Sequence, residues 1–495
     1  MKIRNFRFAL GLAAVLLAPL SAYAQWSKYA DVNEVIGNGA NLQVQPKMAP
    51  TADGGFYIAW LDNSNANYAG YAMRLQRLDV KGRPQWGPNG IVIANRNASY
   101  NTDYGIDVDP TGNALLAFHD LSLVDNLTHV YATKVSPDGR LLWGDASGLI
   151  RLPDGGSNGA LSPRIVSTGD GGAALGWTVN YSSAGLGRVV LQKLDANGAL
   201  LWGDQDIQVP QLNGTNFILS DLHVAEDGGV IASWNAQLGR FINQYWTQKY
   251  DANGQPMWGS TPHILWDDNA GGAIPNGSFS KFVTDGNGGA VYCWDYTFGV
   301  SSRQTRVQHI NADGSERFVH NGVKPSTDTV NNRGNCVVSY DAGADNAFVV
   351  WRERTPGTAN VQVGIYAQRV DGQGNRLWGD TGNALLPVDP IAKDNLVMVP
   401  MPNGFVAAWS LDAYPAPMPV QAAYITSDGN YGWSRGIVGI KSSNSGTLYM
   451  NGAVSRDGYA TFAWTDYFSA TDTSVVAQNI GRDGVLGKKD QGATK

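Results

Sequence analysis

The chain of 495 residues carries 36 Lys and Arg against 42 Asp and Glu, and its formal net charge is −6. This acidic balance argues against nucleic acid and anionic membranes as partners, because both require a basic face. Charged residues make up only 16% of the chain, whereas Gly numbers 60 and aromatic residues reach 10%. This composition favours an all-β fold with many tight turns over a helical fold.

Residues 1–24 have the pattern of a secretory signal peptide. Lys2, Arg4 and Arg7 precede an apolar stretch over 8–20, and Ala22-Tyr23-Ala24 supplies a small-x-small cleavage site. The apolar stretch is too short to span a membrane. We therefore predict a periplasmic or secreted protein with no membrane insertion after cleavage, whose mature net charge is 33 − 42 = −9.

A short phrase, seen most fully as LDANGALLWGD (194–204), recurs along the mature chain. Each copy contains a turn Gly, and an aromatic residue follows four positions later in seven of the eight copies. Asn-Gly and Asp-Gly pairs favour two-residue turns between antiparallel strands. The turn glycines are Gly82, Gly139, Gly198, Gly254, Gly314, Gly374, Gly429 and Gly484. The aromatics are Trp86, Trp143, Trp202, Trp258, Phe318, Trp378 and Trp433, and the eighth copy has Lys488 instead.

A second pattern precedes each copy: a Gly-containing turn and then an apolar strand that ends in an aromatic, as in DGGAALGW (170–177). These aromatics are Trp60, Phe118, Trp177, Trp234, Trp294, Trp351, Trp409 and Trp464. The first and the last lie 404 residues apart over seven intervals, a period near 58 that accommodates about four short strands. Four-stranded repeats stacked radially form β-propeller blades. Residues 25–495 are therefore predicted to fold as one eight-bladed β-propeller of four-stranded antiparallel blades.

The N-terminal end of the mature chain is expected to close this ring. The eighth copy lacks its outer aromatic, while Trp26 lies twenty residues before Pro46, the same spacing as from Trp86 to Ile106. An open propeller would expose the unpaired backbone groups of an edge strand. We predict that the N-terminal segment forms the outer strand of the last blade and that Trp26 occupies the eighth aromatic position.

The repeated phrase resembles the tryptophan-docking motif of eight-bladed bacterial quinoprotein dehydrogenases and of the related propeller of outer-membrane assembly. The resemblance covers only the phrase, and Asp195 stands one residue closer to Gly198 than in that family pattern. It implies the architecture and none of the family's quinone-binding or calcium-binding residues. A Gln also recurs six residues before the turn Gly, where we expect it to satisfy backbone groups between strands. These residues are Gln76, Gln192, Gln248, Gln308, Gln368 and Gln478.

One face of the predicted propeller is more variable than the other. Tight Gly turns connect the first strand to the second and the third to the fourth, whereas the opposite face carries loops that differ in every repeat. Variable loops on a rigid scaffold are where binding usually resides. Fourteen of the sixteen tryptophans occupy repeat positions, and the other two, Trp246 and Trp266, map to the variable face. They are suited either to stacking on sugar rings or to packing under loops.

Charged side chains follow the second-strand aromatic in several blades, and we expect them near the rim of the central cavity. They are Asp62, His119, Asp120, Asp295, Arg352, Glu353, Arg354 and Asp466. Carboxylates from different blades could cleave a glycosidic bond by acid-base catalysis, and Arg352 or Arg354 could hold a substrate carboxylate with two hydrogen bonds. The alternative interpretation is a set of solvated strand ends and ion pairs.

Three hypotheses of function follow. The leading one is an exported propeller that binds an extracellular or envelope ligand through its variable loop face. The expected ligand is a polysaccharide, and the binding candidates are the charged set, Trp246 and Trp266. The second is a polysaccharide lyase or glycoside hydrolase with its site in the central cavity, and the third is an envelope protein-interaction scaffold. We expect a monomer without a cofactor. We also expect no metal site, because the six histidines show no metal-binding spacing. Cys293 and Cys336 either form a disulfide or remain buried thiols.

Overall fold

The computed structural model describes residues 26–487 apart from 66, 68–69, 98–102, 123, 126, 154–159, 180–186, 205–206, 210–214, 240–241, 268–271, 276–279, 299–301, 358–360 and 413–417. The predicted signal peptide lies outside the described residues. The described part of the chain forms 31 β-strands and no α-helix. Accordingly, it contains no helix long and apolar enough to cross a membrane.

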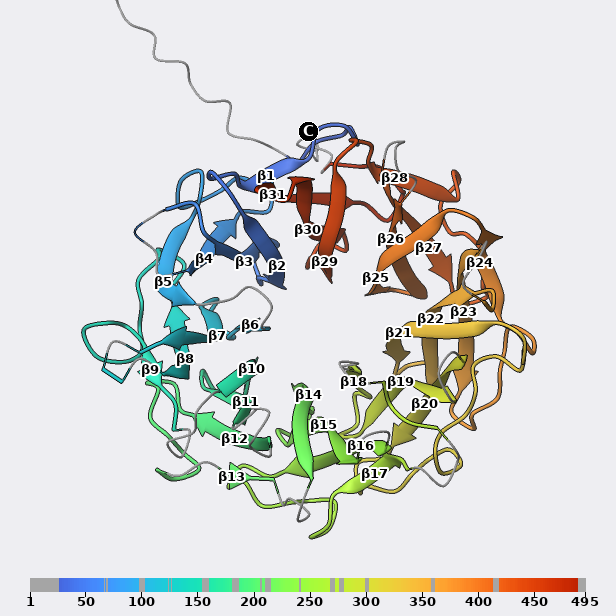
Figure 1. Ribbon diagram of the computed structural model, residues 1–495, viewed down its shortest axis with the longest axis horizontal. Coiled ribbons are helices and arrows are strands. Elements are labelled where there is room, and N and C mark those ends of the chain that lie inside the picture. Colours follow the sequence, from blue (N-terminus) through green and yellow to red (C-terminus); the bar gives the residue numbers. More distant parts are fainter. Residues whose placement is uncertain are drawn as a thin grey trace, which may run out of the picture.

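The strands form eight sheets that surround a common centre as blades (Figure 1). Blade 1 consists of β2 (Gln43–Pro50), β3 (Phe56–Asp62), β4 (Tyr71–Leu78) and β5 (Ile91–Asn97). Blade 2 consists of β6 (Gly105–Val108), β7 (Ala114–Leu121), β8 (Thr128–Val135) and β9 (Ile150–Arg151). Blade 3 consists of β10 (Ala160–Ser167), β11 (Ala173–Val179), β12 (Arg188–Leu194) and β13 (Ile207–Gln208). Blade 4 consists of β14 (Asn216–Val224), β15 (Val230–Gly239), β16 (Ile242–Tyr250) and β17 (His263–Trp266).

The second half of the ring continues in the same order. Blade 5 consists of β18 (Phe282–Thr284), β19 (Ala290–Phe298) and β20 (Ser302–Ile310). Blade 6 consists of β21 (Asn332–Asp341), β22 (Asn346–Arg354), β23 (Val363–Asp371) and β24 (Asn383–Asp389). Blade 7 consists of β25 (Ala392–Met401), β26 (Gly404–Asp412), β27 (Val420–Thr426) and β28 (Ile437–Lys441). Blade 8 consists of β29 (Gly446–Val454), β30 (Ala460–Ser469), β31 (Asp472–Ile480) and β1 (Glu34–Gly37).

Within each blade, neighbouring strands pair antiparallel. In blades 1–7 the strands follow chain order from the centre of the ring outward, whereas in blade 8 the order is β29, β30, β31 and then β1 on the outside (Figure 1). The predicted eight-bladed propeller is therefore confirmed. Blade 5 departs slightly from the pattern among the described residues: its sheet has three strands, and a single bridge between Val307 and Val323 takes the fourth position.

Blade 8 closes the ring with the N-terminal strand, as predicted. Strand β1 pairs with β31, so that Glu34 lies opposite Ala477 and Val35 opposite Val476. Trp26, just before this strand, is 4% exposed. Its backbone N–H donates to the carbonyl of Lys81 in blade 1 at 2.9 Å. The closing segment is thus bonded to both the last and the first blade.

The recurring aromatic of each blade docks on the turn Gly of the next blade. The indole N–H of Trp143 donates to the carbonyl of Ala196 at 3.0 Å, and its ring lies against Gly198. The same indole bond joins Trp86 to Pro137, Trp202 to Ala252, Trp258 to Ala312, Trp378 to Ser427 and Trp433 to Arg482. Phe318 lies against Gly374, and Trp26 lies against Gly82. The repeated phrase therefore has a structural role, because its aromatic residue and turn Gly link consecutive blades around the ring.

The recurring Gln satisfies backbone groups, which confirms its predicted role. The side-chain oxygen of Gln192 accepts from the N–H groups of Lys193 and Trp202, and its amide donates to the carbonyl of Gly203. Four further glutamines repeat this pattern: Gln76, Gln248, Gln308 and Gln368. In blade 2, Thr133 stands at this position and donates to the carbonyl of Gly148 at 2.7 Å.

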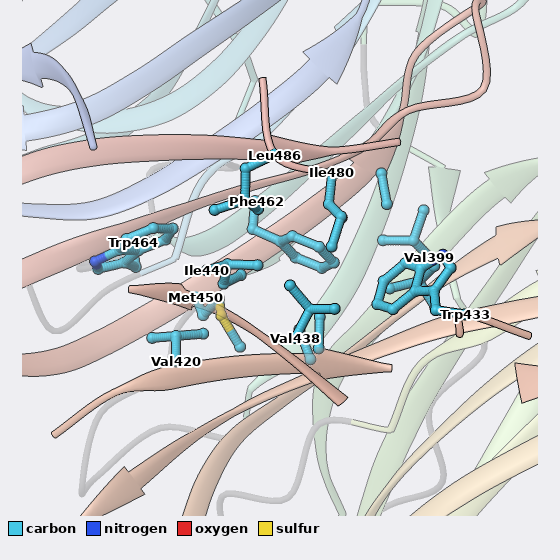
Figure 2. Packing of buried hydrophobic residues seen from close by; sticks show 14 of the residues in the cluster. Val399, Val420, Trp433, Val438, Ile440, Met450, Phe462, Trp464, Ile480 and Leu486 are labelled. Carbon is cyan, nitrogen blue, oxygen red and sulfur yellow. The ribbon is translucent and has the colours of Figure 1, made fainter. Parts of the chain in front are cut away.

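The hydrophobic core is divided among the interfaces between blades, because each sheet packs against a neighbour. The second-strand aromatics are at most 1% exposed in all eight blades. Between blades 7 and 8, Trp433 and Val399 pack in one cluster with Phe462 and Trp464 (Figure 2). Aromatic side chains bury the most area per residue, so these rings supply much of the apolar burial that stabilises the ring.

The two cysteines lie in neighbouring blades. Cys293 in β19 and Cys336 in β21 pack in one core cluster, and both carry free thiols. Burial raises the pKa of Cys336 well above its usual range, and a hydrogen bond with Cys293 adds to this effect. Of the two alternatives that the sequence leaves open, the structure contains free thiols, of which Cys293 is buried and Cys336 is half-buried.

Candidate binding site at the centre of the ring

The innermost strands carry a β-bulge opposite the second-strand Trp. In blade 1, Val44 pairs with Leu61 and Lys47 pairs with Ala59, so that two inner-strand residues stand opposite Trp60. The same two-against-one register shift occurs in blades 3, 6, 7 and 8. In each of these five blades one bulge residue other than Gly adopts a left-handed backbone, with φ between 51° and 56°: Gln45, Ser162, Asn335, Asn395 and Tyr449.

This ring of bulges is held in place from neighbouring blades. The hydroxyl of Thr465 in blade 8 accepts the N–H of Gln45 at 3.2 Å, and the carboxylate of Asp295 in blade 5 accepts the N–H of Asn335 at 2.6 Å. Left-handed residues other than Gly cost about 1–3 kcal/mol each and cluster at functional sites. The repeated strain therefore indicates a candidate functional site at the centre of the ring.

A cavity of about 320 Å³ lies among the innermost strands and the segments that lead into them. Pockets of this size are large enough for a small ligand. Five blades contribute to the lining, which consists of Gln45, Pro46, Lys47, Asp103, Ser162, Arg164, Lys281, Tyr449, Met450 and Asn451. Three of the five left-handed bulge residues are among them.

Lys47, Asp103 and Arg164 form one charge cluster from three consecutive blades. One carboxylate oxygen of Asp103 pairs with the Lys47 ammonium, and the other lies 2.7 Å from the Arg164 guanidinium. Burial acts to raise the pKa of Asp103, but the charges of Arg164 and Lys47 outweigh it and hold that pKa well below its usual range. Asp103 is therefore ionised at neutral pH. Burial lowers the pKa of Lys47 to about 8, although the charge of Asp103 opposes the shift.

The cluster extends to blades 4 and 5. The Arg164 guanidinium lies 3.9 Å from a carboxylate oxygen of Asp221, whose other oxygen is 3.2 Å from His223 Nε2. The His223 ring packs edge-on against Phe282 at 4.6 Å between centroids. Lys281, directly before β18, is exposed, and its positive charge lowers the pKa values of Asp103 and Asp221. It is thus a cation at the cavity that is available to a ligand.

The charge of this lining is opposite to that of the whole molecule. The lining contains three cations, Lys47, Arg164 and Lys281, and one carboxylate, Asp103, in a chain of net charge −6. The amides and hydroxyl of the lining add neutral hydrogen-bonding groups beside these cations. The cavity is therefore suited to an anionic ligand that is also rich in hydroxyl groups.

Three of the carboxylates predicted at the rim lie outside this lining and are held in buried ion pairs. Asp62 is 2% exposed and pairs with Arg74. Asp466 lies 2.8 Å from the Lys441 ammonium. Glu353 lies 3.0 Å from the Arg333 guanidinium and also accepts the indole N–H of Trp351, while burial raises its pKa. These contacts correspond to the ion-pair interpretation.

Three further candidates lie in blades 5 and 6, also outside the lining. Asp295 accepts a backbone N–H at the bulge of blade 6, and burial raises its pKa. Arg352 lies 2.6 Å from Asp394 of blade 7, whereas Arg354 is exposed at the end of β22. Asp295 and the two arginines are therefore not among the described residues that line the cavity of about 320 Å³.

The remaining candidates are buried. His119 and Asp120, at the end of β7, are 3% and 7% exposed. Burial lowers the pKa of His119 to about 4 and raises that of Asp120 to about 6. Trp246 packs against Phe217, and Trp266 is fully buried against Tyr296. A ligand would reach either indole ring only by displacing its neighbours, which fits packing under loops.

The sequence analysis did not predict the cavity residues Lys47, Asp103, Arg164, Lys281 and Tyr449. It placed the candidate charges after the second-strand aromatic, whereas these residues lie on the first strand of a blade or just before it. A signal for three of them was present. Lys47, Arg164 and Lys281 each stand thirteen residues before the second-strand Trp of their blade, and Asp221 does so in blade 4. Charged residues at the same repeat position in four blades indicate that these side chains lie at the same height around the centre of the ring. Nothing in the local sequence marks Tyr449 as a bulge residue.

No protein-family model matches the chain, and no curated protein matches it. Solved structures with partial similarity include an ulvan lyase of polysaccharide lyase family PL25 bound to -[GlcA(1-4)Rha3S]-, with 10% identity over 85% of this chain and 97% of that chain and a TM-score of 0.44. The β-propeller domain of the Trilobed protease from Pyrococcus furiosus has 7% identity over 82% and 99% of the two chains, with a TM-score of 0.40. The NanB sialidase from Streptococcus pneumoniae has 9% identity over 94% and 72%, with a TM-score of 0.40.

Proposed function

We propose that this protein is an exported β-propeller that binds an acidic carbohydrate in its central cavity. The observation that carries the proposal is the cavity lining, where Lys47, Arg164 and Lys281 surround a space of about 320 Å³. Carboxylate or sulfate groups form charge-assisted hydrogen bonds with such cations, and Arg binds them through two parallel bonds. Compared with the leading sequence-based hypothesis, the class of ligand is retained, and the site moves from the loop face to the centre of the ring.

Titration calorimetry with an oligouronate and with its carboxyl-reduced, neutral counterpart tests this proposal. Only the acidic sugar should bind, and added salt should weaken its binding. Lys281→Ala should weaken binding by about tenfold to a hundredfold, because a charge-assisted contact contributes roughly 1.5–3 kcal/mol. Lys324→Ala, which removes an exposed Lys that is not in the cavity lining, is the matched control. Equal binding of the two sugars, or equal effects of the two substitutions, would contradict the proposal.

A polysaccharide lyase is the second candidate function, and one observation favours it. The amine of Lys47, whose pKa burial lowers to about 8, lines the same cavity as Arg164 and Lys281. A lyase needs a base that removes the proton next to a uronate carboxylate while cations neutralise that carboxylate. A hydrolase instead needs a protonated carboxylic acid. Asp103, the one carboxylate of this lining, is held ionised by its neighbours.

Incubation with acidic polysaccharides distinguishes binding from cleavage. If the protein is a lyase, unsaturated uronic products should accumulate, and Lys47→Arg should stop their formation while the polymer is still retained, because Arg keeps the charge but does not act as a base at neutral pH. Retention of the polymer without new products would support binding without catalysis. The absence of both signals would favour the third hypothesis, an envelope protein partner.

A further inference from the structure

Tyr449 is the one aromatic residue among the left-handed bulge residues that surround the cavity. It lies in β29 of blade 8, at the register shift between Leu448 and Asn451, with φ 52°. It lines the cavity together with the three cations, and it is 40% exposed. Tyr449 is therefore exposed at the same cavity that the charged groups line.

The stability of the fold does not account for a Tyr at this position. A bulky residue with positive φ is a backbone outlier, whereas Asn, found at two of the equivalent bulges, is tolerated there and Gly is free of strain. An exposed ring also gains less from burial than the second-strand tryptophans do. Strain of this kind is maintained where the surrounding structure enforces it and is often part of a functional site.

Contacts with blade 1 hold this bulge in place. The side-chain oxygen of Asn451 accepts the N–H of Met48 at 3.1 Å. Thr465, which pairs with Leu448, accepts the N–H of Gln45 at 3.2 Å. The backbone of Tyr449 is thus fixed between two bonds that cross to the next blade, so that the ring is positioned before any ligand arrives.

We infer that Tyr449 is a ligand-contact residue whose ring stacks on the pyranose ring of an acidic sugar, while Lys47, Arg164 and Lys281 hold the acidic group. The inference deepens the proposed function and rests on it. A flat amphipathic side chain on one wall and cations on the others require a ligand with both a ring face and a negative group. Uronates in the pyranose form and sulfated sugars meet this requirement. Inorganic phosphate or sulfate supplies the negative charge but has no ring face.

Three substitutions of Tyr449 separate the role of the ring from that of the strained backbone. Tyr449→Gly removes both the ring and the strain, so it should unfold at a denaturant concentration at least as high as the wild-type protein. Tyr449→Ala removes the ring but keeps the strain, so it should be less stable than Tyr449→Gly. Both should bind an oligouronate about tenfold more weakly, the loss expected for a ligand-contact aromatic. Tyr449→Phe keeps the ring and should bind within about threefold of the wild type.

Asn335→Gly is the matched control, because it relieves the same left-handed strain in blade 6 without changing the cavity lining. It should leave oligouronate binding unchanged. Full-strength binding by Tyr449→Gly, or a loss with Tyr449→Phe as large as with Tyr449→Gly, would overturn the stacking role while the proposed function stands. If the wild-type protein binds no acidic oligosaccharide, the proposed function fails and the role of Tyr449 fails with it.

Discussion

Gly314 links blades 4 and 5 through the close approach of the Trp258 ring. Its φ is +87°, and a Cβ atom at this position would lie 2.7 Å from Trp258 Cγ. Gly112, in the turn between β6 and β7, has the same φ of +87°, but a Cβ atom there would meet nothing within 4 Å. The two glycines therefore share the backbone requirement and differ in the docking contact.

Substituting both glycines should measure the docking contact. Gly112→Ala should cost only the backbone strain, about 1 kcal/mol. Gly314→Ala should cost that amount plus roughly 1–3 kcal/mol for overpacking against Trp258. Chemical denaturation of the two variants gives the difference directly. Equal losses of stability would show that the contact between blades does not depend on the close approach of the indole ring.

The Lys47 ammonium should make ligand binding depend on pH. Its pKa is about 8, so the cavity loses one positive charge as the pH rises through that value. The affinity for an acidic sugar should therefore fall at alkaline pH. Because a bound anion stabilises the protonated amine, the fall should begin at about pH 8 or above. Lys47→Arg remains charged and should remove the fall. Calorimetry from about pH 6 to 9.5 tests this, and an unchanged fall in Lys47→Arg would assign the titration to another group.

At the scale of single elements, strand β1 carries a buried carboxyl that affects ring closure. Glu34 is 6% exposed, and burial raises its pKa from 4.5 to about 7. The folded protein thus retains a proton between these values that the unfolded chain releases. The resulting stability is present at acidic pH and is lost as the pH rises through about 7, and it amounts to at most about 3 kcal/mol.

Glu34→Gln should remove this pH dependence, because Gln resembles the neutral carboxyl in shape and does not titrate. The variant should be more stable than the wild-type protein at about pH 8 and similar to it at about pH 5. The measurement is the free energy of unfolding as a function of pH. Parallel profiles for the two proteins would show that Glu34 is not the titrating group.

The elements differ in how far the sequence predicts them. The blades and their closure could be predicted because turn glycines, docking tryptophans and the spacing from Trp26 to Pro46 are local patterns with a direct physical meaning. The bulges could not, because Gln45 and Tyr449 have no local preference for a left-handed backbone. The register opposite the second-strand Trp imposes that conformation on them.

The candidate site was harder to predict because its chemistry depends on contacts between strands and between blades. Asp62 and Asp466 follow the second-strand aromatic as free carboxylates would, but Arg74 and Lys441 neutralise them from other strands. Asp103 stands outside every repeat phrase, and its importance follows only from the cations that blades 1 and 3 place around it. A single sequence without the register does not show such pairings.

At the scale of the whole molecule, the ring depends on the segment that joins its ends. A chain that begins at Asn38 lacks Trp26 and β1, and it leaves the edge of β31 unpaired. It should lose roughly 3 kcal/mol or more from the missing aromatic alone and should associate through the open edge. Light scattering and denaturation, compared with a chain that begins at Gln25, measure both effects. Equal stability and a monomeric state for the shorter chain would contradict closure by this strand.

The most direct test of the central claim is a crystal structure of the protein with an acidic oligosaccharide bound. We predict density for the sugar in the central cavity, with its acidic group within hydrogen-bond distance of Arg164 and Lys281 and one ring face against Tyr449. A sugar bound only on the loops between blades, with the cavity unchanged, would contradict the assignment of the site to the centre of the ring.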